Sequence, residues 1–372
     1  MKLKDLCSYL DSEVPLSFQE EYDNSGLQIG SPEREIYSAI ASVDVTEEVI
    51  DEAIAKKCDV LISHHPLIFH PVKSLTVKTY TERIIYKAVK NDIAVYTAHT
   101  NLDILGNGVS RKMAEKIGLE EIKVLSPSGN RLLKLVTYIP ESHLEEVRNA
   151  LFEAGAGVIG NYDRCGFITS GTGSFRGNEL TKPFRGEKGK IHFENEIRFE
   201  TILLSHVKDH VLEALLVSHP YEEVAYDLYL LENKNTEVGL GCVGKFHDPV
   251  SENDFLKLVS RLFEAEGVRY SKLTGRPVKK LALCGGSGAS LINLAINSGA
   301  DAFLTADIKY HDFFSSENKI LLVDAGHFET EKFSAEILKD LINKKFPKFA
   351  VRFSEINTNP INYFKDGKSK IT

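Results

Sequence analysis

Three groups of polar side chains stand at the ends of expected strands. They contain the five strongest candidates for chemistry: His64, His65, Asp103, His327 and Glu331. The adjacent histidines close the apolar run 61–63, Asp103 follows the run 93–98, and the last pair follows the run 319–324. Imidazole nitrogens and carboxylate oxygens are common ligands of divalent transition metals. The pattern therefore predicts a metal site.

The placement of these residues indicates that one cleft could hold them all. In an open parallel sheet, ligands gather outside the carboxyl ends of the strands. His327 and Glu331 are four residues apart at the start of an expected helix, which puts both side chains on one face. Three nitrogens and two carboxylates suit one or two ions of Zn, Mn, Fe, Co or Ni. Two ions roughly 3.5–4 Å apart could share a water molecule acidic enough to attack at neutral pH.

Each group taken alone also has an ordinary explanation. Adjacent histidines occur on many loops, and His327 with Glu331 could be an exposed helix face. Asp103 could begin a turn beside Gly106. The joint placement at strand ends is what favours the metal site.

Other residues are weaker candidates for the same cleft. His99 and Asp44 could orient a metal ligand from behind it. Asp307 and His311 follow another expected strand and could line the cleft, although His311 could equally be an ordinary helix residue.

Two further segments could bind an anion. The run Gly285-Gly286-Ser287-Gly288 lies between an expected strand and helix and could hold a phosphate on backbone N–H groups. It lacks the lysine of a P-loop, and a tight structural turn explains it equally well. The Gly-rich loop 171–189 carries four basic residues, which could grip an anionic ligand or simply be solvated: Arg176, Lys182, Arg185 and Lys188.

The first and last thirds of the chain alternate between apolar strands and helices. Strands are expected at 38–43, 59–63, 93–98, 280–284, 302–305 and 319–324. Helices are expected at 46–56 with Thr46 as its cap, and at 79–90, 253–266, 289–297 and 329–343. This alternation predicts a parallel sheet covered on both faces. We interpret residues 1–129 and 236–372 as one α/β body.

The middle third has a different order, β-α-β-β-α-β. Strands are expected at 132–139, 162–169, 196–204 and 224–231, with helices at 142–154 and 208–217. This order is typical of a ferredoxin-like α+β domain. The segments 126–129 and 233–235 are plausible linkers. Residues 130–235 are therefore expected to form a domain inserted into the body.

Composition excludes several classes of partner. The formal net charge is −8, and no lysine or arginine block occurs, so a nucleic-acid patch is not expected. Five dispersed cysteines without a C-x-x-C pair indicate reduced thiols. No apolar run reaches membrane-spanning length and no signal peptide is evident, so we expect a cytoplasmic protein with no membrane contact.

Four ordered motifs resemble the Nif-three-like family, also labelled GTP cyclohydrolase I type 2 homologues. They are residues 23–28 (DNSGLQ), 63–66 (SHHP), 99–103 (HTNLD) and 326–331 (GHFETE). The resemblance implies a Nif-three-like α/β body in which the five positions bind a pair of divalent metal ions. It also implies a toroidal homohexamer with the metal sites facing an inner cavity. The middle third resembles the PII/CutA-like insert of longer bacterial members, most clearly at 219–223 (HPYEE).

Two functions follow as hypotheses. The first is a hydrolase with two metal ions per chain, in which metal-bound water attacks a nucleotide-like or other small anionic substrate. Zinc is the expected metal, with Mn, Fe, Co or Ni as alternatives. The family label suggests ring opening of GTP. The alternative is a non-catalytic metal-binding regulatory protein whose inserted domain senses a small ligand.

Overall fold

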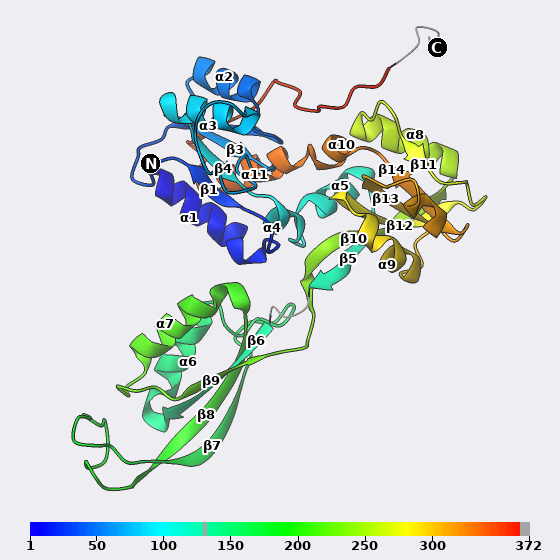
Figure 1. The fold of residues 1–372 in the computed structure, drawn as a ribbon. Helices are drawn as coiled ribbons and strands as arrows, with labels where there is room; N and C mark the ends of the chain where they lie inside the picture. The colour runs from blue at the N-terminus through cyan, green and yellow to red at the C-terminus, as the bar shows by residue number, and fades with distance from the viewer. Residues whose placement is uncertain (129–131, 365–372) are drawn as a thin grey trace. The chain divides into compact units, whose positions relative to one another are not determined.

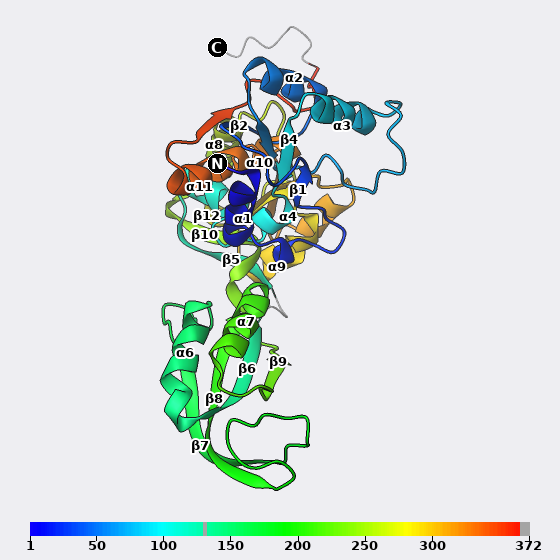
Figure 2. The ribbon, with the colours of Figure 1, turned by 90° about the vertical axis from the view of Figure 1, so that its left-hand side faces the viewer.

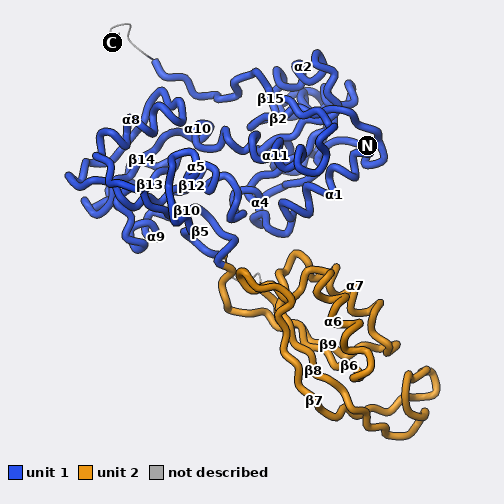
Figure 3. Tube along the Cα trace, turned by 180° about the vertical axis from the view of Figure 1, so that it is seen from behind, with its two compact units in different colours: residues 1–127, 236–372 blue, residues 128–235 orange. Residues whose placement is uncertain are grey.

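The computed structural model describes residues 1–128 and 132–364. The chain forms two compact units (Figure 3). Unit 1, here called the body, comprises Met1–Pro127 and Thr236–Thr372, and unit 2, the insert, comprises Ser128–Asn235. The expected domain boundary between residues 129 and 130 lies outside the described residues.

The first sheet of the body has five strands in the order β1-β4-β3-β2-β15 (Figure 1). Strands β4, β3, β2 and β15 are parallel, whereas the edge strand β1 is antiparallel to β4. Their bounds are β1 (Gly26–Ile29), β2 (Ser38–Ser42), β3 (Val60–Ser63), β4 (Ala94–Thr97) and β15 (Ala350–Phe353). The strands expected at 38–43, 59–63 and 93–98 are thus confirmed as neighbours in one sheet.

The first third of the chain also contains helices, of which the one at 109–117 packs on the second sheet of the body. They are α1 (Leu3–Glu13), α2 (Glu47–Ala55), α3 (Tyr80–Lys90), α4 (Thr100–Asp103) and α5 (Val109–Ile117). Helix α2 begins at the expected cap, because the Thr46 side chain accepts a hydrogen bond from the Val49 N–H. The short α4 and the longer α5 were not expected from the sequence.

The second sheet of the body has six strands in the order β11-β14-β13-β12-β10-β5. Strands β12, β13 and β14 are parallel, and β10 and β11 are antiparallel to their neighbours β12 and β14. The bounds are β5 (Glu120–Ser128), β10 (Asn235–Val250), β11 (Arg269–Tyr270), β12 (Val278–Ser287), β13 (Ala302–Ala306) and β14 (Leu321–Asp324). The helices of the last third of the chain are α8 (Glu252–Phe263), α9 (Ile292–Asn297), α10 (His327–Glu331) and α11 (Ser334–Lys345). Helix α11 packs on β15, β2 and β3 of the first sheet.

The prediction of a single helix at 329–343 is wrong, because two helices, α10 and α11, occupy this segment. Lys332 and Phe333 form the junction, and α8 holds both of them. The Lys332 ammonium donates to the Phe263 carbonyl at 2.9 Å, and the Phe333 ring packs 5.7 Å from the Phe263 ring. The break leaves α10 as a short helix at the end of β14.

Alternate residues of each parallel strand point to opposite faces of its sheet, and both faces are buried. In β3, Leu61 packs with α2 and α3, whereas Val60 and Ile62 join the large core between the two sheets. In β13, Phe303 packs with α9, whereas Ala302 and Leu304 join that same central core. The expectation of strands covered on both faces is therefore confirmed.

The body nevertheless contains two sheets rather than the one open sheet inferred from sequence. Each sheet contains one strand from the other part of the chain. Strand β15, near the C-terminus, pairs with β2, and β5, from the first third, lies beside β10. Apolar periodicity marks which segments are strands but not which strands pair, so it does not distinguish two sheets from one.

The insert is a four-stranded sheet in the order β7-β8-β6-β9, with α6 and α7 packed on one face (Figures 1 and 2). Its elements are β6 (Leu132–Pro140), α6 (Leu144–Glu153), β7 (Gly166–Phe175), β8 (His192–Leu204), α7 (Lys208–Ser218) and β9 (Tyr226–Leu230). The expected order β-α-β-β-α-β is confirmed. The strand expected at 162–169 instead begins at Gly166 and continues to Phe175, because it pairs with β8 along that whole length.

In the part of the chain that the structure describes, no helix is both long enough and apolar enough to cross a membrane.

Candidate metal centre

The five predicted ligand residues come together at strand ends of both sheets. His64 and His65 directly follow β3, and Asp103 ends helix α4 just after β4. His327 and Glu331 are the first and last residues of α10, which follows β14 in the second sheet. The centre therefore lies between the two sheets of the body.

Three imidazole nitrogens surround one carboxylate oxygen of Glu331. Its Oε2 atom lies 2.8 Å from His65 Nε2, 2.9 Å from His327 Nε2 and 3.7 Å from His64 Nε2. The Nε2 atoms of His65 and His327 are 3.3 Å apart. Ligand atoms of His64, His65 and Glu331 all lie within 4.8 Å of one another, which is the spacing of a candidate metal site.

Asp103 completes the buried side of this cluster. Its Oδ1 atom lies 3.5 Å from His64 Nε2. Both atoms are buried, and neither has a hydrogen-bond partner among the described residues. Buried polar atoms without partners are rare and costly. A cation coordinated by the two atoms would satisfy both, so these residues fit a bound metal ion.

Each of the three imidazoles is held from behind through its Nδ1 atom. His64 Nδ1 lies 2.8 Å from the Ala98 carbonyl oxygen. His65 Nδ1 lies 2.7 Å from Asp44 Oδ1, and His327 Nδ1 lies 2.7 Å from Asp307 Oδ2. With Nδ1–H donated to these oxygens, the Nε2 atom faces the centre and offers its lone pair when it carries no proton, as in known carboxylate–histidine–metal arrangements.

Asp23 holds His99 in a similar way. Asp23 Oδ1 lies 2.8 Å from His99 Nδ1, and its Oδ2 accepts from the Thr100 N–H at 3.0 Å. The His99 ring centroid lies 5.4 Å from that of His64 and equally far from that of His65. His99 thus borders the centre, and the motif at 23–28 anchors the turn that carries it.

The ring contacts of His311 are with residues outside this constellation. The side chain is exposed, and its ring neighbours are Tyr310 and Phe314 at centroid distances of 5.2 and 6.3 Å. Asp307, the other weak candidate, bonds His327 as described above.

The charges of the centre favour a cation. Burial disfavours the charged imidazole of His65, but Asp44 and Glu331 outweigh burial and raise its pKa to about 9. Against the same burial, Asp307 and Glu331 raise the pKa of His327 to about 10. Burial raises the pKa of Asp103 to about 6. For Glu331, the surrounding histidines overcome burial and hold its pKa well below the usual range.

The glycine run at 285–288 shapes the centre from behind. Gly286 has a φ of +59°, and a Cβ atom there would lie 1.9 Å from Glu331 Oε1. The Gly286 N–H donates to Thr330 Oγ1 and the Gly288 N–H donates to Thr305 Oγ1. Because these amides have partners within the protein, the run offers no free amides for a phosphate. Residues 285–287 are the irregular end of β12, not a separate turn, and the missing side chain of Gly286 makes room for Glu331.

Sequence reasoning missed several residues that support the centre. Asp23 lay in a motif without an assigned role, and the Ala98 carbonyl carries no side-chain signal. Thr358, in the segment after β15, donates from Oγ1 to Asp44 Oδ2 at 2.6 Å. Nothing in the local pattern marks Thr358, because its partner lies 314 residues away in the sequence.

Histidines and carboxylates held at facing strand ends of two sheets define a mixed α/β protein with a candidate divalent-metal site. The chain matches the model of the Duf34/NIF3 (NGG1p interacting factor 3) family over residues 1–360. It therefore belongs to that family.

Relatives of known name and structure resemble the whole chain. A Halalkalibacterium halodurans protein named GTP cyclohydrolase 1 type 2 homolog is 39% identical over 355 residues, covering 94% of this chain and 95% of that protein. A Bacillus subtilis protein of the same name is 39% identical over 359 residues, covering 94% and 95%. The crystal structure of a Bacillus cereus protein related to NIF3 superposes with a TM-score of 0.84 at 36% identity, covering 98% of this chain and 99% of that one.

Proposed function

We propose that this protein is a metal-dependent hydrolase that binds two divalent metal ions, preferably zinc, and acts on a nucleotide-like substrate. One observation carries the proposal. Three imidazole Nε2 atoms converge on a single Glu331 oxygen while each Nδ1 atom is anchored elsewhere. Such convergence of anchored imidazoles around a carboxylate is characteristic of metal centres.

The ligand residues divide into two groups. His64 and Asp103 form the buried side, His65 and His327 form the more open side, and Glu331 stands between them. When bound, the ions would acidify a water molecule and polarise a substrate oxygen. Asp44 and Asp307 keep the two open-side imidazoles oriented. A substrate would approach from this open side, since its histidines keep 23% and 34% of their side-chain surface exposed.

The substrate class rests on weaker support than the metal ions. The name shared by the relatives refers to a GTP cyclohydrolase homologue, which favours a nucleotide. The Gly286 and Gly288 amides at the end of β12 have internal partners and are not free to bind a phosphate. An anionic substrate would therefore bind chiefly through the metal ions.

The test combines metal analysis with a substrate screen. Purified wild-type protein and Asp103→Ala are analysed for metal by mass spectrometry, then assayed on GTP, other nucleotides and phosphodiesters. We expect two ions per chain in the wild type, fewer in the variant, and turnover only in the wild type. Metal-loaded wild type without turnover on the whole panel would count against the hydrolase. Turnover that survives His64→Ala would exclude this centre from the reaction.

The second candidate is a metal-binding regulatory protein with a PII/CutA-like sensor domain. The insert supports it by having its own core around Leu135, Leu151 and Phe199, separate from the cores of the body. Removing residues 130–235 should abolish a response to a small ligand but leave metal bound. An unchanged response in the shortened protein would contradict the sensor role.

We include a toroidal homohexamer in the proposal, on the strength of the family resemblance. Sedimentation at several protein concentrations should give the mass of six chains. A monomer or dimer throughout would contradict this assembly.

A further inference from the structure

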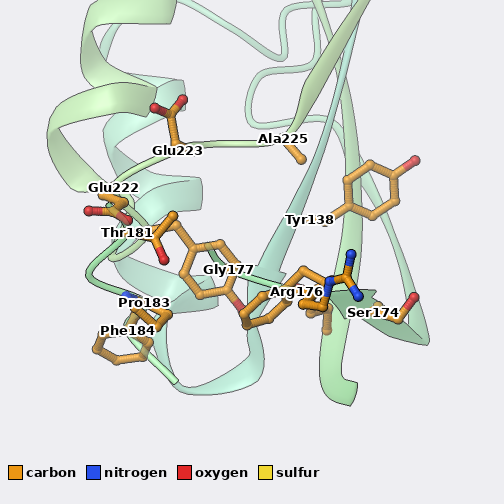
Figure 4. A pocket seen from close by; sticks show the side chains of 14 residues that line it. Tyr138, Ser174, Arg176, Gly177, Thr181, Pro183, Phe184, Glu222, Glu223 and Ala225 are labelled. Atoms are coloured by element: carbon orange, nitrogen blue, oxygen red, sulfur yellow. The ribbon is translucent and has the colours of Figure 1, made fainter. Parts of the chain in front are cut away.

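The insert contains a cavity of about 410 Å³ that no part of the proposed reaction uses. It lies among the C-terminal half of β7, the loop after it, β8 and the segment between α7 and β9 (Figure 4). A volume of this size falls in the range of small-molecule sites. The cavity belongs to the insert alone, so its occupancy is independent of the metal centre.

Aromatic rings form the walls of the cavity. The Phe175 and Phe184 rings lie 6.4 and 6.1 Å from the Tyr221 ring, centroid to centroid. Phe175 and Tyr221 are half-buried, and 45% of Phe184 remains exposed. Tyr138 is the fourth aromatic residue of the lining. The Arg185 guanidinium lies 5.8 Å from the centroid of the Phe184 ring, and the remaining ring surfaces provide π faces that a ligand could cover.

A carboxylate lies beside these rings. Glu196 Oε1 accepts a hydrogen bond from the Tyr221 hydroxyl at 2.8 Å. Its Oε2 atom occupies the space next to Gly173, where a Cβ atom would approach within 2.0 Å. Among the charged residues that line the cavity, Glu196 is half-buried, whereas Arg176, Glu222 and Glu223 are exposed. The most enclosed charge of the cavity is therefore negative.

The basic residues of the neighbouring loop do not reverse this charge. Arg185 pairs with Glu194 at 3.7 Å, and Lys188 donates to the Glu179 carbonyl at 2.8 Å. Figure 4 shows the Arg176 guanidinium apart from the carboxylates of Glu222 and Glu223. Three carboxylates and one guanidinium line the cavity. This balance disfavours the anionic ligand that the basic residues of the loop suggested in the sequence.

We infer that this cavity binds a small organic cation, such as a quaternary or protonated amine. Its charge would face Glu196, and its apolar substituents would cover the rings of Phe175, Phe184 and Tyr221. Aromatic rings attract cations through their negative faces, and a neighbouring carboxylate adds to that attraction. This inference names the ligand chemistry of the insert and does not depend on hydrolysis in the body.

Binding to the full-length protein tests the inference. Choline is the probe, and 3,3-dimethylbutan-1-ol, which has nearly the same shape without the charge, is its neutral match. We expect choline to bind at least about tenfold more tightly than the alcohol in calorimetric titrations. Glu196→Gln should reduce choline affinity about tenfold, whereas Glu213→Gln, an exposed carboxylate of α7 outside the cavity, should leave it unchanged.

Other outcomes would overturn the inference. Equal binding of choline and the alcohol would show that the ligand's charge plays no role. Saturation by pyrophosphate or ATP with no binding of choline would show that the cavity prefers an anion. Loss of self-association in Phe184→Ala would show that a second copy of the chain covers the cavity instead. Circular dichroism and thermal unfolding of the same samples check that each variant has folded, because the metal content of the body would not report on the insert.

Discussion

The buried and open sides of the candidate metal centre are built differently. On the buried side, His64 has no exposed side-chain surface, a backbone carbonyl orients it, and its Nε2 faces an unpartnered Asp103 oxygen. On the open side, His65 and His327 are oriented by carboxylates and also bonded to Glu331. The two unpartnered atoms of the buried side would both be satisfied by a cation, whereas on the open side a metal ion would have to displace protons from the imidazoles under the proposed function.

Replacing Glu331 by glutamine should have the largest effect, because this side chain serves both sides. The amide removes the charge that the three imidazoles share, and we expect loss of both metal ions after dialysis. Metal analysis by mass spectrometry measures the outcome. Glu336→Gln, a partly exposed carboxylate of α11, is the matched control and should retain full metal content. Retention of one ion by the Glu331 variant would show that one side binds independently.

Gly286→Ala should weaken metal binding by pushing Glu331 out of place. Gly299→Ala is the control, since Gly299 also has a positive φ, +75°, but a Cβ atom added there would meet no described atom within 4 Å. Both variants should lose about 1 kcal/mol of stability from backbone strain. Only the Gly286 variant should lose metal affinity, measured by competition with a chelator. Equal affinities in the two variants would refute the steric role of Gly286.

The open side should make metal binding depend on pH. With pKa values of about 9 and about 10, His65 and His327 are protonated at pH 7 in the metal-free protein. A metal ion must displace these protons, so affinity should rise with pH by up to about 100-fold per unit between pH 6 and 8. Calorimetry in buffers of different ionisation enthalpy counts the protons released, and His327→Ala should release one fewer.

The same two groups give the metal-free fold its own pH dependence. The ion pairs of the protonated imidazoles stabilise the fold, and this stabilisation is fully present below the ordinary histidine pKa of 6.5. It is lost as the pH rises through 9 to 10, where the two imidazoles lose their protons. Metal-loaded protein should lack this loss. Identical thermal unfolding profiles for the two forms would contradict the assignment of protons to the open side.

Thr358→Val should have the smallest effect, because Thr358 acts only through Asp44. Loss of its 2.6 Å hydrogen bond frees one Asp44 oxygen while the other still holds His65. We expect metal affinity to fall roughly two- to fivefold. This loss is smaller than the roughly 10–100-fold loss that is typical when a residue bonded directly to a ligand is replaced. Thr358→Ser should restore the wild-type value in the same chelator competition. A loss as large as that of an Asp44→Asn variant would mean that Thr358 does more than orient Asp44.

Much of this arrangement could be predicted from the sequence, because it depends on local signals. Apolar runs located the parallel strands, and the spacing of His327 and Glu331 placed both on one helix. Asp44 was expected behind a ligand because it ends a strand, and it does hold His65. These inferences need only the neighbours of a residue in the sequence.

The remainder depends on contacts between distant segments. The pairing of β15 with β2 and the Thr358–Asp44 hydrogen bond join the two ends of the body, and no local pattern records either. The role of Gly286 became clear only from its approach to Glu331, since a glycine-rich turn suits a phosphate and a crowded carboxylate equally well. The insert cavity likewise depends on side chains from several strands and loops.

The exchange of strands between the two sheets has a consequence for synthesis on the ribosome. Ala350 pairs with Ser38, so the edge of β2 stays open until residues 350–353 have emerged. Late partners of this kind slow folding and leave strand edges exposed to aggregation. The contacts of His64 and His65 with Glu331 likewise cannot form until Glu331 has been synthesised. A chain that ends before residue 331 would lack both the closing strand and the central carboxylate, so metal binding at the proposed centre would require synthesis to pass Glu331.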